Sequence, residues 1–565
     1  MRGPAVTGRL PASLARASVA FLSMEIGLES GMRCYSGGLG VLAGDFALAA
    51  ADLGLPMVFI SLACRAGDVR QTIDALGRQE DGPDPWEPAD WAAPLPVEPS
   101  IAIEGRPVRI RAWLREIEGV GGAKLPVLLL DTDLPANAPA DRAITGRLYG
   151  GDADFRIRQE AVLGLGGKAV LDALGLKISK YHLNEGHAAL LPLALLADGM
   201  TVDAVRACAV FTTHTPIPAG HDRFAMAAVR AIIGDALADQ ASRLFDGAAE
   251  LDMTRLALAL TGWVNGVSHK HAEVTRLMFP GEAIHAVTNG IHHGRWTHPA
   301  IAALFDRAVP EWRANAAALA GVETAIADED LWAAHETAKQ ALIDDIRERT
   351  GRMLDPERPL IGFARRMTPY KRADLLFGHL VRLLRIAEHR PFQVVLSGKA
   401  HPHDKGGKAL IARLHEVAHS CGEHLPVVFL PGYDIDLAGR LVAGCDVWLN
   451  TPEPPLEASG TSGMKAAVNG GLNLSVLDGW WLEGCVHGRN GWSIGNERDA
   501  AAAGHDEQLL ELLDREVLPT WYEDRSRWIA MMKHAIASLG PRFSAERAMR
   551  DYAAQAYGEA VTVSG

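Results

Sequence analysis

A run of basic residues stands where a predicted buried strand ends. The strand is expected at 360–364, and Arg365, Arg366, Lys371 and Arg372 follow it. Guanidinium and ammonium groups bind phosphate oxygens through charge-assisted hydrogen bonds. A solvated surface loop would have the same composition, and spacing alone does not separate the two. The whole chain is acidic, with 56 basic and 69 acidic residues and a net charge of −13, so this concentration of cations favours a small phosphate pocket.

A second segment, 457–465 (EASGTSGMK), is rich in glycine, serine and threonine and leads into a predicted helix over 464–469. Backbone N–H groups in such a turn can bind an anion or sugar hydroxyls. The segment lacks the residue order of a P-loop. The lysine that ends it, Lys465, is open to three roles: a phosphate ligand, a Schiff-base lysine or a surface residue.

A third segment, residues 36–44, contains a G-x-G-x-x-A match at Gly38, Gly40 and Ala43. It lies more than ten residues beyond the preceding predicted strand, and no acidic ribose-binding residue ends the next strand, so a dinucleotide site is disfavoured. We expect a glycine-rich loop whose backbone approaches an anion or a sugar. No histidine or cysteine spacing matches a zinc site, and we predict no metal.

Alternating short apolar runs and amphipathic stretches must position these segments. Helices are expected at 159–174, 330–350 and 374–389. Buried strands are expected at 19–24, 57–63, 126–131, 181–184 and 207–213, and then at 360–364, 392–397, 426–430, 446–450 and 472–477. Continuous apolar runs of this length are typical of parallel sheets covered by helices on both faces. Polar segments follow many of these strands, which predicts one cleft between two facing α/β domains, because ligands bind at the carboxyl ends of such strands.

Composition and length limit the alternatives further. The 565 residues are 48% hydrophobic and 22% charged, as expected of a globular chain of several domains. We predict an N-terminal Rossmann-like domain (1–300), a helical transition (301–357), a second Rossmann-like domain (358–505) and C-terminal helices packing back across the domains (506–565). The acidic balance disfavours nucleic acid as a partner, and no apolar run is long enough to span a membrane. Six cysteines without a CxxC pair and no recognisable signal peptide predict a cytoplasmic protein.

Two aromatic segments have mainly structural interpretations. Trp480 and Trp481 follow a predicted strand and are expected in the core, although stacking on a sugar is the alternative. The stretch 80–91 (EDGPDPWEPADW) is expected to be an exposed connection.

Taken together, the segments resemble the α-glucan phosphorylases, the family of glycogen and maltodextrin phosphorylases, and in particular its short prokaryotic branch. The matching segments, in family order, are FLSMEIGL (21–28), YSGGLGVLAGD (35–45), HLNEGHAAL (182–190), FTTHTPIPAGHDRF (211–224), VNGVSHKHAE (264–273), VTNGIHHGRW (287–296), FARRMTPYKR (363–372), SGKAHPHD (397–404), LPGYDIDLA (430–438) and EASGTSGMKAAVNGGLNLSVLDGWW (457–481). They span most of the chain.

The resemblance implies a GT-B glycosyltransferase fold and an α-1,4-glucan phosphorylase that releases α-glucose 1-phosphate with retention of configuration. It also implies pyridoxal 5′-phosphate bound as a Schiff base to Lys465, with its phosphate acting as a proton relay beside the substrate phosphate. The implied partners are an α-glucan or maltodextrin, inorganic phosphate and glucose 1-phosphate, and a homodimer is among the assemblies it allows.

The same resemblance assigns roles to individual residues. Arg366 and Lys371 would bind substrate phosphate, and His214 would hydrogen-bond the glucosyl ring; these three are the catalytic residues. The cofactor would be held by Lys465, Tyr433, Thr461, Ser462, Gly463 and Gly38. The substrate would be held by Gly37, through its backbone N–H, and by Asn289, Glu457, Ser459, Gly460 and Arg365.

Two departures from the family pattern lower the positive charge near the expected cleft. Pro452, Glu453, Pro454 and Pro455 stand where many short-branch members have Pro-Arg-Arg-Pro, and Asp434 stands where animal and plant members have arginine. These changes bear on phosphate affinity and acceptor preference. Two other functions stay open. One is a nucleotide-sugar-dependent α-glucan synthase, which has the same fold and shares the EASGT-like glucose segment; the other is a non-catalytic glucan-binding relative, which these changes suggest.

Overall fold

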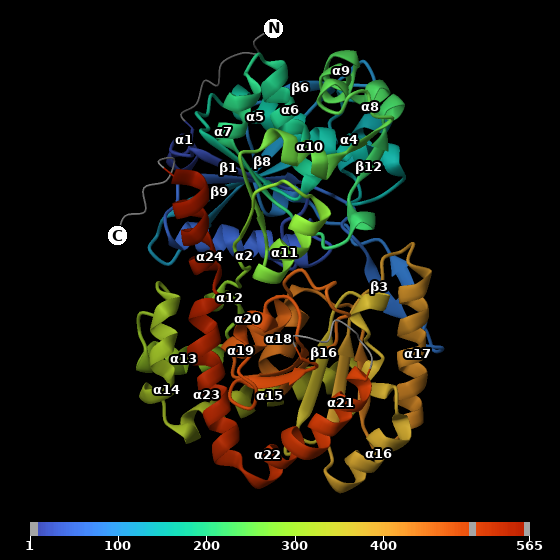
Figure 1. Ribbon diagram of the computed structural model, residues 1–565, viewed down its shortest axis with the longest axis vertical. Helices are drawn as coiled ribbons and strands as arrows, with labels where there is room; N and C mark the ends of the chain where they lie inside the picture. The colour runs from blue at the N-terminus through green and yellow to red at the C-terminus, as the bar shows by residue number, and fades with distance from the viewer. Residues whose placement is uncertain (1–9, 497–503, 559–565) are drawn as a thin grey trace.

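The computed structural model describes residues 10–496 and 504–558. Two α/β halves, each built on its own open sheet, lie one above the other in Figure 1. The upper sheet has the order β15-β14-β11-β10-β1-β2-β9-β8-β5 and the lower sheet β18-β17-β16-β19-β20-β21. The upper strands are β1 Val19–Ser23, β2 Met57–Leu62, β5 Ala93–Pro94, β8 Arg111–Glu118, β9 Lys124–Asp131, β10 Lys180–Asn184, β11 Ala209–Thr212, β14 Trp263–Gly266 and β15 Ile284–Ala286. The lower strands are β16 Leu360–Ala364, β17 Gln393–Ser397, β18 Val427–Leu430, β19 Val447–Asn450, β20 Leu472–Val476 and β21 Gly491–Ile494.

All ten predicted strands form, with ends within two residues of the prediction, and the α/β class with two Rossmann-like halves is confirmed. The prediction of purely parallel sheets is wrong at one edge, where β8 runs antiparallel to β9 and β5 antiparallel to β8. β8 mixes buried and partly exposed residues, as a strand with one solvated face does, so it gives no continuous apolar run. The short strands β14, β15 and β21 also escaped prediction, because glycine or polar residues interrupt them.

The helices depart from the prediction in three places. A helix, α2 (Gly38–Asp52), begins inside the segment that we expected to be a glycine-rich loop. The helix predicted at 374–389 starts later, as α16 (Leu380–His389), and the one predicted at 159–174 contains a π-helical turn at Val162–Gly166. Other helices are α4 Ala153–Ala161, α5 Gly167–Ala173, α15 Asp328–Thr350, α17 Lys405–Cys421, α18 Ile435–Gly444, α19 Ser462–Val468, α21 His505–Leu512, α22 Leu518–Glu523, α23 Arg525–Arg542 and α24 Ala545–Tyr552.

The stretch 80–91 is not simply an exposed connection. Its first residues belong to β4 (Gln79–Gly82), which pairs with β3 (Arg70–Ile73) in an antiparallel hairpin. Trp86 is also tied to the body of the protein, because its Nε1 donates to the carbonyl of Cys64 at 2.8 Å.

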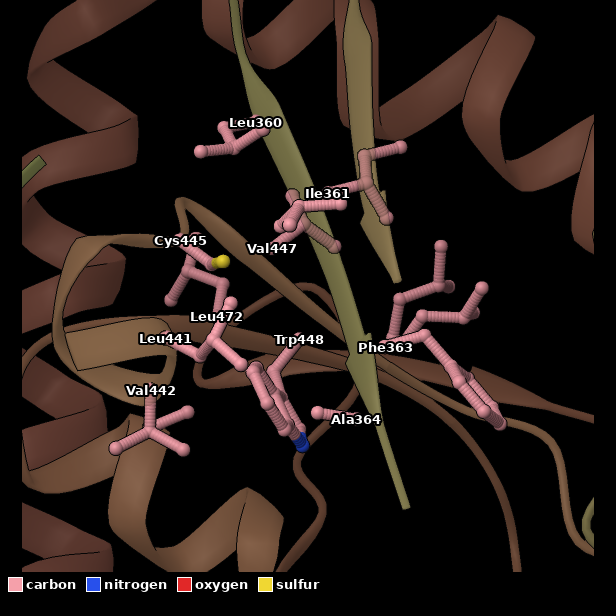
Figure 2. Close-up of a cluster of buried hydrophobic side chains, with 14 of the residues drawn as sticks. Leu360, Ile361, Phe363, Ala364, Leu441, Val442, Cys445, Val447, Trp448 and Leu472 are labelled. Carbon is pink, nitrogen blue, oxygen red and sulfur yellow. The ribbon is translucent and has the colours of Figure 1, made fainter. Parts of the chain in front are cut away.

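The lower half is packed around its central strand. Figure 2 shows Cys445 and Trp448 on one side of β16 and Phe363 on the other. A Cβ atom at Gly362 would lie 2.4 Å from Cys445 Sγ, so the strand needs glycine where this core is tightest. Trp480 and Trp481 are 3% and 0% exposed, which confirms core packing for both. Such burial keeps the strand ends, and the loops that follow them, in fixed positions.

The C-terminal helices connect the halves. In Figure 1, α23 runs along the lower half and α24 continues onto the upper half. There Tyr552 is fully buried and its hydroxyl accepts a hydrogen bond from Asn265 Nδ2 at 3.0 Å. We keep the four-part domain division, with boundaries near 300, 357 and 505, as a proposal; its first nine and last seven residues lie outside the described part. None of the helices in residues 10–496 and 504–558 has the length and hydrophobicity that crossing a membrane requires.

Candidate active site

A cavity of about 800 Å³ lies between the two halves, at the ends of strands from both sheets. Glu25, Glu185 and His214 line it from the upper half, after β1, β10 and β11. Arg365 and Lys399 line it from the lower half, after β16 and β17. This is the location expected of a ligand site in open α/β sheets.

The cavity brings together all of the predicted site residues except one. The residues that line it are Gly37, Gly38, His214, Asn289, Arg365, Arg366, Lys371, Tyr433, Glu457, Ser459, Gly460, Thr461, Ser462 and Lys465. The exception is Gly463, which lies behind the wall: a Cβ atom there would be 2.2 Å from Asn473 Oδ1 and 2.8 Å from the Trp480 ring. Glycine at this position therefore serves the packing of α19 on the core.

The cationic loop, defined as residues 365–372, is anchored by one carboxylate. Arg365 Nη2 and Lys371 Nζ both donate to Glu457 Oε2, each at 2.6 Å. Burial alone would raise the pKa of Glu457, but the charges of Arg365 and Lys371 outweigh it and lower the pKa to about 2. The predicted phosphate-binding lysine and the predicted sugar-binding carboxylate are thus partners. Glu457 is a fixed anion that orients two cations toward the cavity.

Arg366 differs from its neighbours because it pairs with no carboxylate in the described residues. Its side chain is exposed to the cavity and reaches across to the upper half. A Cβ atom at Gly37 would lie only 2.5 Å from Arg366 Nη2, so the guanidinium packs directly against this glycine. An exposed, unpaired guanidinium in a cleft is a ready anion ligand.

We expected the backbone N–H of Gly37 to be free to bind substrate, but in the structure it already has a partner. The N–H groups of Ser36 and Gly37 donate to Glu25 Oε2, at 2.6 and 3.0 Å. The other carboxylate oxygen of Glu25 accepts from the Tyr149 hydroxyl at 2.8 Å. The turn is thus filled by a side chain of the protein itself. Gly38 remains open, since nothing lies within 4 Å of a Cβ atom placed there.

Lys465 is a buried amine that has no counter-ion among the residues that the structure describes. It lies in α19, is 7% exposed, and its Nζ is 3.8 Å from the centre of the Trp296 ring. No hydrogen bond or ion pair joins this Nζ to another residue in the described ranges. Burial lowers the pKa of Lys465 to about 8, against the opposing charge of Asp45 and with help from Arg295. A larger fraction of the amine is therefore neutral, and so nucleophilic, near neutral pH than for an ordinary lysine.

Several polar atoms on the cavity side are buried and unsatisfied. Asn289 Oδ1, Ser459 Oγ and Arg365 Nη1 have no hydrogen-bond partner among the described residues. Leaving a buried polar group unpaired costs about 1–3 kcal/mol, so such groups in a cavity point to a polar ligand. Amide, hydroxyl and guanidinium groups together suit a molecule rich in hydroxyls.

His214 is held in the neutral form by its surroundings. Its backbone N–H donates to Glu185 Oε2 at 2.7 Å, and its Nε2 lies 2.7 Å from Asn184 Oδ1. Burial lowers the pKa of His214 to about 4, although the charge of Glu185 opposes this. Glu185 itself has a left-handed φ of +77°, a strained conformation for a residue with a side chain. This turn fixes His214 as a neutral hydrogen-bonding group.

The wall of the cavity that Lys465 lines also offers hydroxyl donors. Burial raises the pKa of Tyr433 to about 12, with Arg365 opposing, so the phenol keeps its proton and can donate. Thr461 and Ser462 begin α19, and Ser462 Oγ lies 3.4 Å from Asn450 Oδ1. The three hydroxyl-bearing side chains line the same cavity as Lys465.

Sequence reasoning missed part of the upper wall. Glu25, Tyr149 and Arg156 line the cavity and were not predicted. The Arg156 guanidinium lies 4.2 Å from the centre of the Tyr149 ring and donates to Asp222 Oδ2 at 3.0 Å. Glu25 stands two residues after a buried strand, a signal that could have found it. Tyr149 follows no strand, and only its contact with Glu25 identifies it.

The assembled site combines the guanidinium of Arg366, the amine of Lys465 and the neutral imidazole of His214. It also contains the buried polar atoms described above, which lack a hydrogen-bond partner among the described residues and could pair with sugar hydroxyls. Within the described ranges, no group of three histidine, cysteine, aspartate or glutamate side chains could hold a metal ion. The chemistry that these residues can perform is the binding of phosphate and of a polyhydroxylated substrate in one enclosed cleft.

Comparison with known proteins agrees with this chemistry. The family model of the carbohydrate phosphorylases matches residues 217–487. The chain is 40% identical to the maltodextrin phosphorylase of Thermococcus litoralis, over 96% of this chain and 71% of that protein. It is 34% identical to the glycogen phosphorylase of Aquifex aeolicus, over 97% of this chain and 87% of that protein. An uncharacterised protein of Methanocaldococcus jannaschii is 30% identical over 95% of this chain and 99% of its own length. The chain therefore belongs to the carbohydrate phosphorylase family.

Proposed function

We propose that this protein is an α-1,4-glucan phosphorylase. It would transfer the terminal glucosyl unit of a glucan to inorganic phosphate and release α-glucose 1-phosphate with retained configuration. The observation that carries the proposal is the presence, in one cavity, of Arg366 and the buried Lys465, neither of which forms an ion pair within residues 10–496 and 504–558. One group suits an anionic substrate and the other a carbonyl cofactor. The relatives named maltodextrin and glycogen phosphorylase support the same activity.

The residues around Lys465 fit pyridoxal 5′-phosphate. An aldehyde reacts with a neutral amine, and burial makes the Lys465 amine neutral at a lower pH than usual. Tyr433, Thr461 and Ser462 offer hydroxyls to the cofactor phosphate, and Gly38 leaves room for it on the facing wall. When bound, the cofactor would supply a phosphate group with a pKa near 6, suited to exchanging a proton with a second phosphate.

The remaining residues would bind and orient the substrates. Arg366 would hold the substrate phosphate, with Lys371 adding positive charge from its fixed place beside Glu457. Asn289 and Ser459 would pair their unsatisfied oxygens with sugar hydroxyls, and Glu457 has a second oxygen for the same purpose. His214, neutral at physiological pH, would hydrogen-bond the ring without adding charge. Enclosure between the halves would exclude water, which otherwise would hydrolyse the glucan.

The departures from the family pattern at Asp434 and Glu453 leave the substrate-binding residues in place. Asp434 Oδ1 accepts from the N–H of Leu437 at the start of α18, and its Oδ2 is 3.7 Å from Arg33 Nη1, a cation that also lines the cavity. Glu453 is exposed, and its backbone N–H donates to Tyr370 O at 2.8 Å. A phosphorylase with moderate phosphate affinity is therefore expected rather than an inactive relative.

One experiment separates the proposal from the synthase alternative. Maltoheptaose is incubated with glucose 1-phosphate or with ADP-glucose, and chain growth is followed by mass spectrometry. The proposal expects growth with glucose 1-phosphate alone, and growth only with ADP-glucose would replace it by the synthase. Binding of maltoheptaose without growth from either donor would indicate a non-catalytic glucan-binding protein.

A second experiment addresses the cofactor. The purified protein is reduced with borohydride, digested, and searched for a peptide carrying a pyridoxyl phosphate mass. We expect the modification on Lys465; modification elsewhere, or none after incubation with the cofactor, would contradict this assignment. A cytoplasmic location, supported by six free cysteines in the described structure, and a homodimer remain parts of the proposal.

A further inference from the structure

The β3–β4 hairpin belongs to the upper half of the chain but packs on the lower half. In Figure 1 it lies beside α17. In each strand the most buried residue is a glutamine: Gln71 is 4% and Gln79 7% exposed, whereas their strand neighbours are exposed or only partly buried. Buried amides are costly unless every donor and acceptor is paired.

Both amides are fully paired, mainly across the boundary between the halves. Gln71 Nε2 donates to Gly398 O at 2.9 Å and to Gln79 Oε1 at 2.8 Å, and its Oε1 accepts from Gly432 N at 2.8 Å. Gln79 Nε2 donates to Ala400 O at 2.8 Å and to Asp81 Oδ1, within the hairpin, at 2.7 Å, and its Oε1 accepts from Ala400 N at 3.0 Å. We call this set of bonds the clasp.

The hydrogen bonds of the clasp end on the backbone of two loops that form the lower wall of the cavity. Gly398 and Ala400 flank Lys399, and Gly432 precedes Tyr433; Lys399 and Tyr433 both line the cavity. Lys399 crosses the boundary in the opposite direction, because its Nζ donates to Val69 O at 2.9 Å. Displacing these loops would move the wall that faces the substrate.

The segment 397–400, which the clasp fixes, is hydrogen-bonded to the cationic loop. Arg365 N donates to Ser397 O at 3.2 Å, and Met367 N donates to Lys399 O at 2.9 Å, so Arg366 stands between two anchored residues. Gly398 also packs against the carbonyl of Arg365, since a Cβ atom there would lie 1.9 Å from that oxygen. A continuous series of hydrogen bonds and backbone contacts therefore connects the two glutamines with the residues on either side of Arg366.

We propose that Gln71 and Gln79 are positioning residues for phosphate binding, because they fix the cationic loop so that Arg366 faces Gly37 across the cleft. The inference rests on the proposed function of Arg366. Neither glutamine lines the cavity, so each acts through the backbone that it holds. In this way the upper half contributes to the phosphate site through two residues that do not line it.

The test replaces each glutamine by methionine, which has a similar volume but makes no amide hydrogen bonds. The matched control is Arg78→Ala, which removes the exposed ion pair with Asp74 in the turn of the same hairpin and leaves every bond of the two glutamines in place. Phosphorolysis of maltoheptaose gives KM for phosphate and for glucan. Hydrogen–deuterium exchange at the amides of Met367 and Ala400 reports the loop directly, without depending on activity.

For Gln71→Met and Gln79→Met we expect a KM for phosphate raised at least tenfold, a KM for maltoheptaose within twofold of the wild type, and exchange at both amides at least tenfold faster. Arg78→Ala should change none of these. Faster exchange with an unchanged KM for phosphate would show a merely structural clasp and overturn the inference, as would unchanged exchange. A wild-type protein without phosphorolysis would instead overturn the proposed function, while the exchange data still report whether the clasp holds the loop.

Discussion

The pairing of two cations with one buried carboxylate makes Glu457→Gln an informative substitution. The wild-type Glu457 Oε2 neutralises both Arg365 and Lys371 at 2.6 Å, and all three side chains are at most 10% exposed. Glutamine keeps the shape but removes the charge. Two buried cations would then face each other without an anion. We therefore expect lower stability of the folded protein, with the loss centred on the lower half.

Two arguments give the same magnitude. Lowering the pKa of Glu457 from 4.5 to about 2 corresponds to about 3 kcal/mol of preference for the charged form. Removing one partner of a buried ion pair typically costs about 3–5 kcal/mol. Because the folded pKa lies below the ordinary value, this stabilisation is complete above about pH 4.5 and is lost as the pH falls toward 2. The full difference is thus expected at neutral pH.

The assay is urea unfolding at pH 7, followed by tryptophan fluorescence. Glu453→Gln is the control, since it removes an exposed carboxylate from the same loop, and a change of at most about 0.5 kcal/mol is expected for it. For Glu457→Gln we expect a loss of about 3 kcal/mol. A loss below about 1 kcal/mol, or a gain in stability, would refute the view that Glu457 is the anion that holds the two cations.

Further substitutions test the other charged groups of the cavity. Arg366→Ala should raise KM for phosphate about 10- to 150-fold, the equivalent of one charge-assisted hydrogen bond of about 1.5–3 kcal/mol, with the KM for glucan unchanged in the same kinetic series. The rate at which pyridoxal phosphate and borohydride modify Lys465 should fall as the pH drops below about 8, whereas a lysine of ordinary pKa would show this fall near pH 10.5; mass spectrometry of the labelled peptide distinguishes the two. Burial raises the pKa of Asp478 to about 7, so the native state binds more protons than the unfolded state between about pH 4 and 7 and stability falls as the pH rises through that window. Asp478→Asn should flatten that slope in urea unfolding curves, and an unchanged slope would show that Asp478 is not its source.

The fold could be predicted where the sequence carries a periodic signal. Strands such as Leu360–Ala364 are continuous apolar runs, and their ends fall where expected. The edge strand Arg111–Glu118 and the short strand Gly491–Ile494 carry no such signal, because one face is solvated or the run is too brief. The helix that begins at Gly38 was missed for a different reason: glycine is a poor helix former, and tertiary packing outweighs that preference here.

The sequence predicted which residues line the site better than it predicted which of them pair with one another. Residues after strand ends, such as His214 and Arg365, do converge on one cavity. Which groups neutralise each other depends on contacts between residues far apart in the chain. The sequence does not reveal that Lys371 donates a hydrogen bond to Glu457, or that the Gly37 N–H donates one to Glu25. Gln71 and Gln79 gave no signal at all, since a polar residue in a short hairpin is ordinarily exposed.

The most direct test of the central claim is phosphorus NMR of a mixture of maltoheptaose, inorganic phosphate and the cofactor-loaded protein. The account predicts a growing signal of α-glucose 1-phosphate that needs phosphate and is absent with Lys465→Ala. It would be contradicted by the β-anomer, by free glucose in the proton spectrum of the same sample with no phosphate ester in the phosphorus spectrum, or by a Lys465→Ala protein as active as the wild type.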